Sequence, residues 1–404
     1  MTRLIAGIDV GSTTVKAVVA DAETDEILWK DYRRHETRQL DTLLDFLERM
    51  ERETDFGPGN GRVFLTGSGA SIFTELIGAK FVQEVLAASL AVERRCPEAS
   101  SYVEIGGQDA KIVIMRRDPG GGPVKKFPSM NDKCAGGTGS VIDKISKKLG
   151  IPLEDLSRLR YDGLRLHPVA GKCGVFAETD INGLQKQGIP AEELMASLFE
   201  AFVVQNLQVL ARGHTLLPQV VLLGGPNAFI PGMREAWVHN ITLMWRERGV
   251  RIPEGSRPGD LIRAPQDAEY YGALGAIEFG RDEEAEVGHY LGSGKLRDLH
   301  AERSRGEGRS GTGIPALARS EEEVASFLAA YAPPPFVPPK FSPGDIARGF
   351  IGIDGGSTST KAVLLSPGGE VLARAYQLSK GNPIQDTVEI LEKLRGQVES
   401  QGAR

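Results

Sequence analysis

The chain of 404 residues has little cysteine and little aromatic character, with three Cys, three Trp and 6% Phe, Trp and Tyr in all. An odd number of cysteines argues against a framework of disulfides and leaves metal binding or redox chemistry open. Basic residues are also in deficit, because 48 Lys and Arg stand against 54 Asp and Glu and the formal net charge is −6. Without a global basic field, the chain is not expected to bind nucleic acid or an anionic lipid surface.

Long apolar runs are missing as well. No stretch approaches the roughly 18 apolar residues that a membrane-spanning helix needs. Residues 1–10 are too short a segment for a signal peptide, and Asp9 interrupts their apolar character. We therefore expect a cytoplasmic protein without membrane contact. The apolar fraction of 41% is ample for a buried core, and the length allows two or three domains.

Glycine, in contrast, is plentiful at 49 residues, and several glycines lie in turns between apolar stretches. The first such turn joins two expected strands, residues 4–10 and 15–20. It contains Asp9, Gly11, Ser12, Thr13 and Thr14, with Lys16 just beyond. Glycine permits a tight turn in which backbone N–H groups approach a phosphate, and the hydroxyls add donors. Asp9 is a candidate to hold a hydrated Mg²⁺, and Lys16 is a candidate to neutralise phosphate charge.

Two more glycine-rich turns follow expected strands. Gly106, Gly107, Gln108 and Asp109 come after Glu104, between the strands expected at 102–105 and 112–115. Gly224, Gly225, Pro226 and Asn227 lie between a strand expected at 220–223 and a helix expected to run through Trp237. Asp109 is a second candidate to order Mg²⁺ and the attacking water, and Gln108 is a candidate to orient that water. Glu104 is a candidate for either role, or for an ion pair with a lysine. Neither G-x-x-x-x-G-K-[ST] nor a strand-linked G-x-G-x-x-G occurs.

In this order, the three turns resemble those of the actin, hexokinase and heat-shock-protein-70 superfamily. There, two hairpin turns hold the phosphates of ATP or ADP and a Gly-Gly turn flanks the adenosine. The resemblance implies an α/β fold built from duplicated ribonuclease H-like domains, in which catalysis is mostly positioning and charge neutralisation. Apolar strands and helical patterns alternate over residues 1 to about 280, which also favours an α/β fold. One of the expected helices spans residues 81–94.

The first turn recurs late in the chain, since G-I-D-V-G-S-T-T-V-K-A-V from Gly7 returns as G-I-D-G-G-S-T-S-T-K-A-V from Gly352. Such a repeat indicates a duplicated module. Residues 281–347 are polar and then proline-rich, which is typical of a linker, and a short helix is expected within them at residues 321–331. We expect an ATPase domain over residues 1–280, a linker over 281–347, and over 348–404 the start of a second, truncated ATPase domain without a complete nucleotide site.

Two of the three cysteines have similar settings. Cys134 precedes a helical pattern over residues 141–149, and Cys173 precedes one over residues 175–186. A helix N-terminus lowers the pKa of a thiol and stabilises negative charge, which suits a metal–thiolate cluster. Cys96, just before Pro97, is interpreted as a buried structural cysteine.

The glycine-rich residues after Cys134 are also expected to contact nucleotide, namely Gly136, Gly137 and Thr138.

A four-iron cluster needs about four thiolates. Two per chain are enough if a second copy contributes two more across a twofold interface. The cysteines therefore predict a homodimer that holds one bridging [4Fe–4S] cluster. A Cys₄ zinc site and a metal-free Cys134–Cys173 redox switch are the alternatives.

The cysteine segments resemble a known family. The runs from Asn131 to Gly139 and from Gly171 to Asp180, together with the first two turns, are similar to the ATP-dependent activators of 2-hydroxyacyl-CoA dehydratases and to the ATPase subunits of benzoyl-CoA reductase. This resemblance covers residues 1 to about 280, and the motif at Gly352 resembles tandem members of the family.

The resemblance implies that Cys134 and Cys173 of both subunits hold the [4Fe–4S] cluster and that two ATP molecules drive the subunits to reorient. One low-potential electron would then pass to a partner iron–sulfur dehydratase or reductase, and a donor such as ferredoxin or flavodoxin would replace it. A small-metabolite kinase and an actin-like or regulatory nucleotide-binding protein are the rival interpretations. Neither rival gives a role to the two cysteines.

Overall fold

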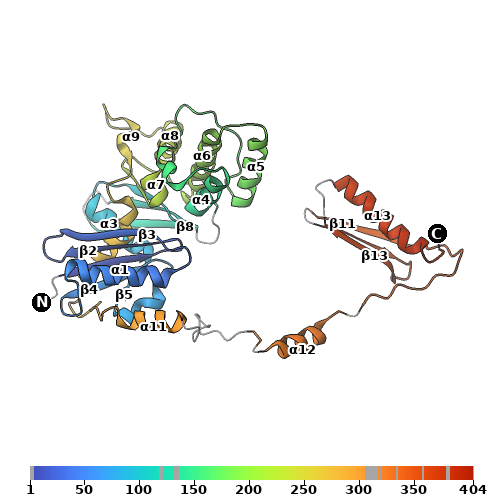
Figure 1. Cartoon of the computed structure of the whole chain (residues 1–404). Helices are drawn as coiled ribbons and strands as arrows, with labels where there is room; N and C mark the ends of the chain where they lie inside the picture. The colour runs from blue at the N-terminus through green and yellow to red at the C-terminus, as the bar shows by residue number, and fades with distance from the viewer. Residues whose placement is uncertain are drawn as a thin grey trace. The chain divides into compact units, whose positions relative to one another are not determined.

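The computed structural model describes residues 4–117, 122–131, 136–304, 317–318, 320–333, 335–356, 359–378 and 383–403. The chain forms two compact units, Met1–Arg309 and Ser310–Arg404 (Figure 1). Among the helices of the described ranges, none is both long enough and apolar enough to cross a bilayer.

The first sheet of the first unit has the strand order β3-β2-β1-β4-β5. Its strands are β1 (Leu4–Val10), β2 (Thr14–Asp21), β3 (Ile27–Arg34), β4 (Gly61–Thr66) and β5 (Lys80–Phe81). β1 and β2 form an antiparallel hairpin around the first glycine-rich turn, and β4 runs parallel to β1. Every residue of β1 is buried, because β1 is a central strand with neighbours on both edges.

The second sheet repeats this pattern with the order β10-β9-β6-β7-β8. Its strands are β6 (Ser101–Ile105), β7 (Ala110–Arg116), β8 (Lys125–Asn131), β9 (Val220–Leu223) and β10 (Ile262–Arg263). Here β6 and β7 form the antiparallel hairpin, around Gly106 and Gly107, and β9 runs parallel to β6. The two sheets are thus two copies of one topology, as a duplicated α/β fold requires.

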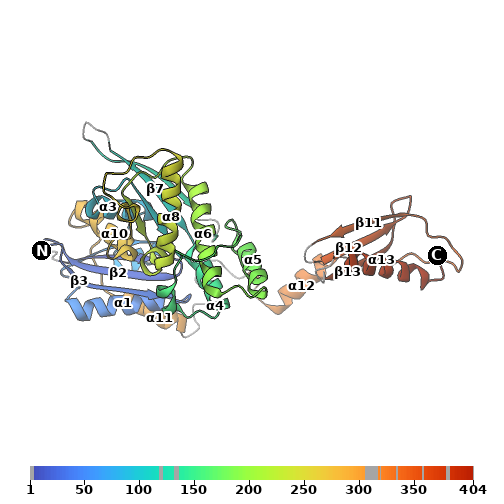
Figure 2. The ribbon, with the colours of Figure 1, turned by 90° about the horizontal axis from the view of Figure 1, so that it is seen from above.

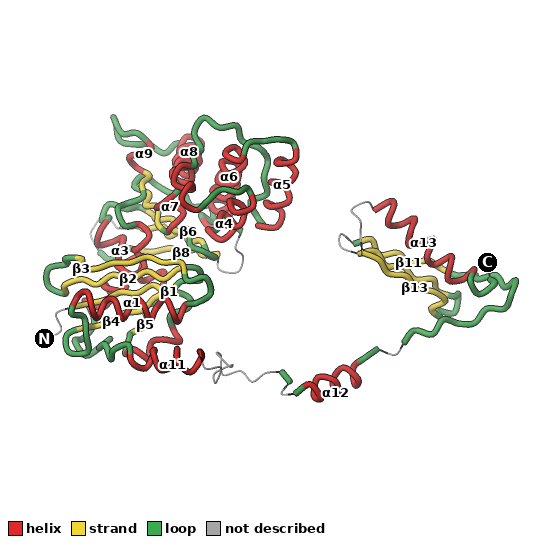
Figure 3. The backbone as a smooth tube through the Cα atoms, viewed as in Figure 1, coloured by secondary structure: helices red, strands yellow, loops and turns green. Residues whose placement is uncertain are grey.

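Helices and sheets of the first unit alternate in layers (Figures 1 and 3). The outer layer on the first sheet is α1 (Gln39–Thr54) with α11 (Gly294–Ser304), and α3 (Glu84–Arg95) and α10 (Tyr271–Asp282) lie between the sheets. The outer face of the second sheet carries α4 (Gly139–Lys148), α5 (Gly174–Lys186), α6 (Ala191–Leu210) and α8 (Pro231–Glu247). Short helical turns complete the unit: η1 (Ser71–Phe73), α2 (Thr74–Ile77), η2 (Leu153–Arg158), α7 (Gly225–Phe229), α9 (Pro258–Leu261) and η3 (Ala268–Tyr270).

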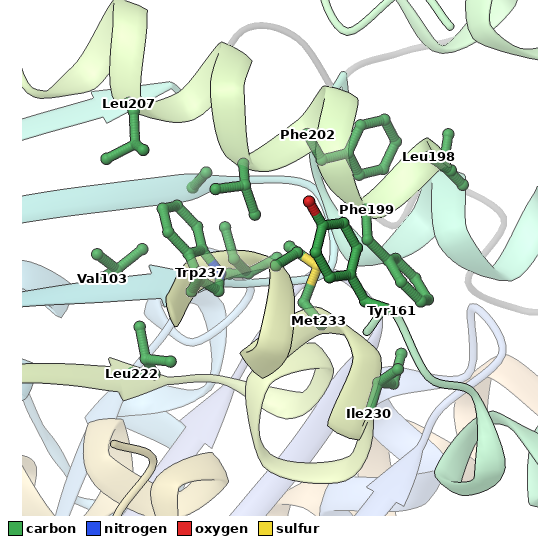
Figure 4. Packing of buried hydrophobic residues seen from close by; sticks show 14 of the residues in the cluster. Val103, Tyr161, Leu198, Phe199, Phe202, Leu207, Leu222, Ile230, Met233 and Trp237 are labelled. Atoms are coloured by element: carbon green, nitrogen blue, oxygen red, sulfur yellow. The ribbon is translucent and has the colours of Figure 1, made fainter. Parts of the chain in front are cut away.

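The core on the outer face of the second sheet joins that sheet to α6 and α8. Figure 4 shows Val103 and Leu222 of the sheet with Phe202 of α6 and with Met233 and Trp237 of α8. All five side chains are essentially inaccessible to solvent. This packing gives the sheet a rigid backing, so that the turns at its strand ends are held in place.

The elements differ from the sequence prediction at two helices. Phe81 pairs with Leu65 in β5, so the helix expected from residue 81 begins only at Glu84. Its N-cap is Gln83, whose side chain accepts a hydrogen bond from the N–H of Leu86 at 2.9 Å. The helix expected to run through Trp237 is broken at Ile230, where the backbone is extended between α7 and α8.

Residues 290–304, which are expected from the sequence to belong to the linker, pack against α1. The Tyr290 hydroxyl donates to the Glu51 carboxylate at 2.7 Å, and the N–H of Ser293 donates to the same group at 2.9 Å. Arg297 of α11 forms an ion pair with Glu48 at 2.8 Å. The chain therefore remains bound to the first unit as far as α11.

The second unit contains α12 (Glu321–Tyr331) and an antiparallel sheet in the order β11-β12-β13. Its other elements are β11 (Phe350–Gly355), β12 (Ser359–Leu365), β13 (Val371–Leu378) and α13 (Pro383–Glu399). They repeat the order of β1, β2, β3 and α1, and α13 lies along the sheet (Figure 2). Ile390 and Leu394 of α13 are buried with residues of the sheet. β11 is exposed along its length, since no strand that the structure describes pairs with its outer edge.

Candidate active site

Two adjoining cavities of about 740 and 610 Å³ lie between the hairpin turns of the two sheets of the first unit. They adjoin each other, because six residues line both: Thr13, Thr14, Lys16, Glu104, Gly106 and Gly107. One cavity is mostly polar and charged, whereas the other contains most of the apolar side chains. We refer to them as the phosphate end and the nucleoside end of one cleft.

The two hairpin turns are tight and lie against each other. The N–H of Gly11 donates to the Thr14 carbonyl, and the N–H of Gly106 donates to the Asp109 carbonyl, both at 2.9 Å. A Cβ on Gly107 would lie 2.1 Å from Oγ1 of Thr13. Only glycine at this position lets the second turn approach the first so closely, and together the turns form a cradle of N–H groups and hydroxyls.

An ion pair lies beneath the first turn. Lys16 Nζ lies 2.7 Å from Oδ2 of Asp9, its register partner on the neighbouring strand. Burial alone would lower the pKa of the Lys16 ammonium, but the Asp9 carboxylate outweighs burial and the pKa is raised. Lys16 is therefore a fixed positive charge at the phosphate end. The second unit repeats the pair, with Lys361 Nζ 3.0 Å from Asp354.

A second lysine lies beneath the second turn. Lys111 Nζ is 3.0 Å from Glu84 and 3.5 Å from Glu104, and it also contacts Asp109. Burial lowers the pKa of Lys111, but the carboxylates Glu104, Asp109 and Glu84 outweigh it, and the pKa lies well above its ordinary value. Burial also raises the pKa of the Glu104 carboxyl, in spite of Lys111.

The phosphate end thus has an excess of negative charge. Its lining includes four carboxylates, Asp9, Glu84, Glu104 and Asp109, but two ammonium groups, Lys16 and Lys111. A triphosphate would need a cation beside it to enter such a site. The carboxylate oxygens of Asp9 and Asp109 are the kind of hard ligands that Mg²⁺ takes, usually through water. The donor set therefore fits Mg²⁺ bound together with a nucleotide.

The nucleoside end combines aromatic and aliphatic side chains. The rings of Tyr32 and Phe229 pack edge to face with centroids 5.4 Å apart, and Ile142 and Ile230 line the same cavity. Such a slot suits the flat apolar surface of a nucleobase. Gly224, Gly225 and Pro226 form its edge, and Gly224 has a left-handed φ of 87°.

An ion pair crosses the nucleoside end. Arg34, the last residue of β3, forms two hydrogen bonds with Asp143 of α4, one of them 3.0 Å long between Nη2 and Oδ1. The hydrogen bond with Asp143 raises the pKa of Arg34. The pair joins the first sheet to the helix layer of the second sheet across the cleft.

Most nucleotide-site residues expected from the sequence line this cleft. These are Asp9, Gly11, Ser12, Thr13, Thr14, Lys16, Glu104, Gly106, Gly107, Gln108, Asp109, Gly224, Gly225 and Pro226. Asn227 is not among the lining residues, since it is buried and its amide donates to the Leu223 carbonyl at 2.8 Å. Gly136, Gly137 and Thr138 do not line it either. Instead the next residues connect α4 to the second turn, with Gly139 N donating to Gly106 O at 2.9 Å and Ser140 N to Gly107 O at 2.8 Å.

Sequence reasoning missed several lining residues: Tyr32, Arg34, Thr66, Ser68, Glu84, Lys111, Ile142, Asp143 and Phe229. Lys111 has a signal in the sequence. The register pairs Glu104 with Lys111 as it pairs Asp9 with Lys16, and D-V-G-S-T-T-V-K aligns with E-I-G-G-Q-D-A-K. The other residues come from separate elements and have no local motif.

Cys173 is the N-cap residue of α5 and is partly exposed. Backbone N–H groups of Phe176 and Val175 bond to its sulfur and lower the pKa of the thiol. A thiolate stabilised in this way fits a metal–sulfur cluster. Cys134 lies outside the described residues. In the part of the chain that the structure does describe, no group of three or more His, Cys, Asp and Glu side chains is arranged to hold a metal ion.

α5 is attached to α4 by a charged clamp. Glu178 of α5 lies 2.5 Å from Lys144 and 2.7 Å from Lys148, both on α4. The bonds from Lys144 and Lys148 hold the pKa of Glu178 at about 2. The helix that Cys173 caps is thereby connected, through α4, to the second glycine-rich turn.

Comparison with known proteins matches residues 6–247 with the BadF/BadG/BcrA/BcrD ATPase family. One of the subunits of the benzoyl-CoA reductase of Thauera aromatica is 25% identical over 69% of this chain and 93% of its own length. The (R)-2-hydroxyglutaryl-CoA dehydratase activating ATPase of Acidaminococcus fermentans is 26% identical over 67% of this chain and 94% of its own length.

Among solved structures, the activator of the 2-hydroxyisocaproyl-CoA dehydratase from Clostridium difficile with bound ADPNP superposes with a TM-score of 0.53. It is 22% identical in sequence, and the match covers 78% of this chain and 99% of that one. At this identity the likeness shows the fold. The α/β fold of actin-like and hexokinase-like ATPases that the sequence predicts is confirmed.

Proposed function

Because this chain belongs to the BadF/BadG/BcrA/BcrD ATPase family, we propose that it hydrolyses ATP in order to deliver a low-potential electron to a partner iron–sulfur acyl-CoA dehydratase or reductase. The family resemblance predicted from the sequence is confirmed by this match. Relatives are named as activators of such dehydratases and as a subunit of benzoyl-CoA reductase, so a dehydratase or reductase is the expected kind of partner. A small-metabolite kinase is less favoured for the same reason.

The cleft between the two hairpins is the observation that carries the ATPase part of the proposal. Hydroxyls of Ser12 and Thr13 and neighbouring N–H groups would bind the terminal phosphates, and Lys16 would neutralise part of their charge. Asp9 and Asp109 would hold Mg²⁺, which supplies charge neutralisation when bound. Gln108 would orient the attacking water. All of these side chains line the same cavity, at the phosphate end of the cleft.

The electron-transfer part depends on the cysteines. Cys134 and Cys173 of two chains would hold one [4Fe–4S] cluster in a homodimer, and the cluster supplies one-electron chemistry when bound. The N–H groups of Val175 and Phe176, which stabilise negative charge on the Cys173 sulfur, support this assignment. A ferredoxin or a flavodoxin would be the electron donor.

A continuous set of contacts supports coupling between the two sites. The second hairpin turn accepts hydrogen bonds from the first two residues of α4, Gly139 and Ser140. α4 in turn binds Glu178, one turn into the helix that Cys173 caps. A shift of the hairpin on binding or hydrolysis of nucleotide would therefore move α4 and α5 together.

The test is purification without oxygen, followed by iron quantification and EPR spectroscopy of the dithionite-reduced sample. A bridging cluster predicts about two iron atoms per chain. Cys134→Ala and Cys173→Ala should lose the iron, the brown colour and electron delivery. Cys96→Ala is the matched control, because Cys96 is buried next to Tyr271 and lies outside the cleft, and this variant should keep its iron.

Each alternative has its own outcome. Zinc in place of iron in this assay would favour the Cys₄ zinc site. Reversible loss of activity on oxidation of a metal-free protein would favour the redox switch. An oxygen-free preparation that is colourless, lacks iron and still activates a dehydratase would contradict the proposal.

A further inference from the structure

We propose that the hydroxyl of Thr66 binds and orients the water that attacks the terminal phosphate of ATP. Thr66 is the last residue of β4, it is fully buried, and it lines the phosphate end of the cleft. This inference rests on the proposed ATPase activity and adds to it a residue from a third strand, outside both hairpin turns.

The sheet register sets the direction of the Thr66 side chain. Thr66 is the parallel partner of Asp9, whose antiparallel partner is Lys16. Paired residues on neighbouring strands present their side chains on one face of a sheet. Thr66 therefore faces the same side as the Asp9–Lys16 pair, which lies at the phosphate end of the cleft.

The turn after Thr66 is fixed to the first hairpin. Gly67 has a left-handed φ of 99°, and a Cβ on it would lie 2.4 Å from the Val10 carbonyl oxygen and 2.6 Å from Oδ1 of Asp9. The N–H of Gly69 donates to the same Val10 carbonyl at 2.9 Å. Thr66 is thus held at a defined place beside Asp9, as the positioning of a reacting water requires.

The hydroxyl of Thr66 is available for such a water. Its Oγ1 is buried and has no hydrogen-bond partner among the described residues. A buried hydroxyl without a hydrogen-bond partner lowers the stability of the fold, and valine would fill the same volume without this cost. The presence of threonine at this position therefore indicates that its hydroxyl binds a ligand. The lysines nearby are already engaged, Lys16 by Asp9 and Lys111 by its three carboxylates.

The surroundings of Thr66 favour water over a phosphate oxygen. Asp9 and Glu104 line the same cavity, and their negative charge repels phosphate oxygens but accepts the protons of a water molecule. The Thr66 hydroxyl oxygen can accept a hydrogen bond from one O–H of the water, which leaves a lone pair of the water oxygen free and fixes its direction. The donors that phosphate needs are offered by Ser12 and Thr13, in the first hairpin turn.

In the reaction, the water oxygen forms a bond to the γ-phosphorus. The bond from that phosphorus to the β–γ bridging oxygen breaks, and its electron pair leaves with ADP. One proton of the water stays on the released hydrogen phosphate, and the other passes to solvent. Thr66 orients the water and is itself unchanged.

The experiment compares Thr66→Val, Thr66→Ser and the matched control Ser71→Ala in the full chain. Ser71 is exposed, follows the same turn and does not line the cleft. Thr66→Val should reduce kcat for ATP hydrolysis by about 100-fold, the loss expected when a reacting group is no longer held in position. Its Kd for ADP, measured by calorimetry, should change less than about threefold, since no bond to nucleotide is lost. Thr66→Ser should recover most of the rate, and Ser71→Ala should hydrolyse ATP like the unmodified chain.

The thermal midpoint separates this role from a structural one. Thr66→Val exchanges an unpartnered buried hydroxyl for a methyl group of the same shape, so the melting temperature should stay the same or rise. A normal hydrolysis rate in a folded Thr66→Val variant would overturn the inference, and so would a parallel loss of rate and ADP affinity. If Thr66→Val does not fold, a Thr66→Ser variant as slow as Thr66→Ala overturns it. An unmodified chain that does not hydrolyse ATP would instead refute the proposed function itself.

Discussion

The close approach of the two hairpin turns leads to a quantitative prediction for Gly107→Ala. The added Cβ would lie 2.1 Å from Oγ1 and 2.6 Å from Cγ2 of Thr13. Ordinary van der Waals contact begins near 3.4 Å, so the turns must separate, or Thr13 must rotate, by about 1.3 Å. Either movement takes the Thr13 hydroxyl away from the position where the cradle would hold a phosphate.

The size of the effect follows from the cost of overpacking. Inserting one carbon into a well-packed site costs about 1–3 kcal/mol. If the whole of this free energy destabilises the arrangement of the two turns that binds nucleotide, the Kd for ADP rises by a factor of about 5 to 150, at 1.4 kcal/mol for each tenfold change. Hydrolysis should fall at least as much, because the cradle must also position the terminal phosphate.

The assay is titration calorimetry with ADP, together with steady-state ATP hydrolysis. Gly59→Ala is the matched control, since nothing lies within 4 Å of an added Cβ there, and it should bind ADP normally. Adding Thr13→Ala to Gly107→Ala removes the two nearest of the three clashing atoms and leaves only Cβ of residue 13, at 2.9 Å, so the double variant should lose less affinity than the sum of the single variants. A Gly107→Ala variant that binds ADP within twofold of the unmodified chain would refute the close contact between the turns.

Two more predictions concern α5, the helix that Cys173 caps. Gly183→Ala should raise the free energy of unfolding by about 0.5–1 kcal/mol, because alanine reduces the conformational entropy of the unfolded chain. In the folded helix the added Cβ meets nothing within 4 Å. Thermal unfolding checks this prediction, and a lower melting temperature would contradict it. Glu178→Gln should speed hydrogen exchange of α5 amides at pH 7, because the clamp to Lys144 and Lys148 is lost. Since the pKa of Glu178 is lowered from 4.5 to about 2, the clamp is fully present above pH 4.5 and is lost as the pH falls through 2, so the difference from the unmodified chain should shrink steadily over that range. A difference as large at pH 2 as at pH 7 would contradict it.

Local patterns were enough to locate many elements of the fold. The expected strands at residues 4–10 and 220–223 coincide with β1 and β9, because each is a short apolar run that ends at glycine or just before it. The expected helix from residue 321 coincides with α12, where Ser320 accepts a hydrogen bond from the N–H of Glu323. Phe81 was assigned wrongly because its partner in β5, Leu65, is distant in sequence and a single sequence does not reveal that pairing.

The two hairpin turns show which features of the site a sequence motif can predict. Residues of the turns, from Gly11 to Thr14 and from Gly106 to Asp109, were found because glycine, hydroxyl and carboxyl groups at that spacing suit a phosphate. Asn227 belongs to the same kind of pattern, yet its amide bonds to Leu223 and its side chain is buried. A motif specifies which residue types are near a ligand, but it does not specify which side of the chain each one faces.

The sequence alone determined the family, the strand–turn–strand units and the duplication, because these depend on residues that are neighbours along the chain. Only the tertiary structure decided that Arg34 and Asp143 pair across the cleft, that Lys111 lies among three carboxylates, and that Thr66 lies beside Asp9. Each of those contacts joins elements that meet when the sheets pair and the layers stack. Their energies depend on burial and distance, and neither quantity exists until the chain has folded.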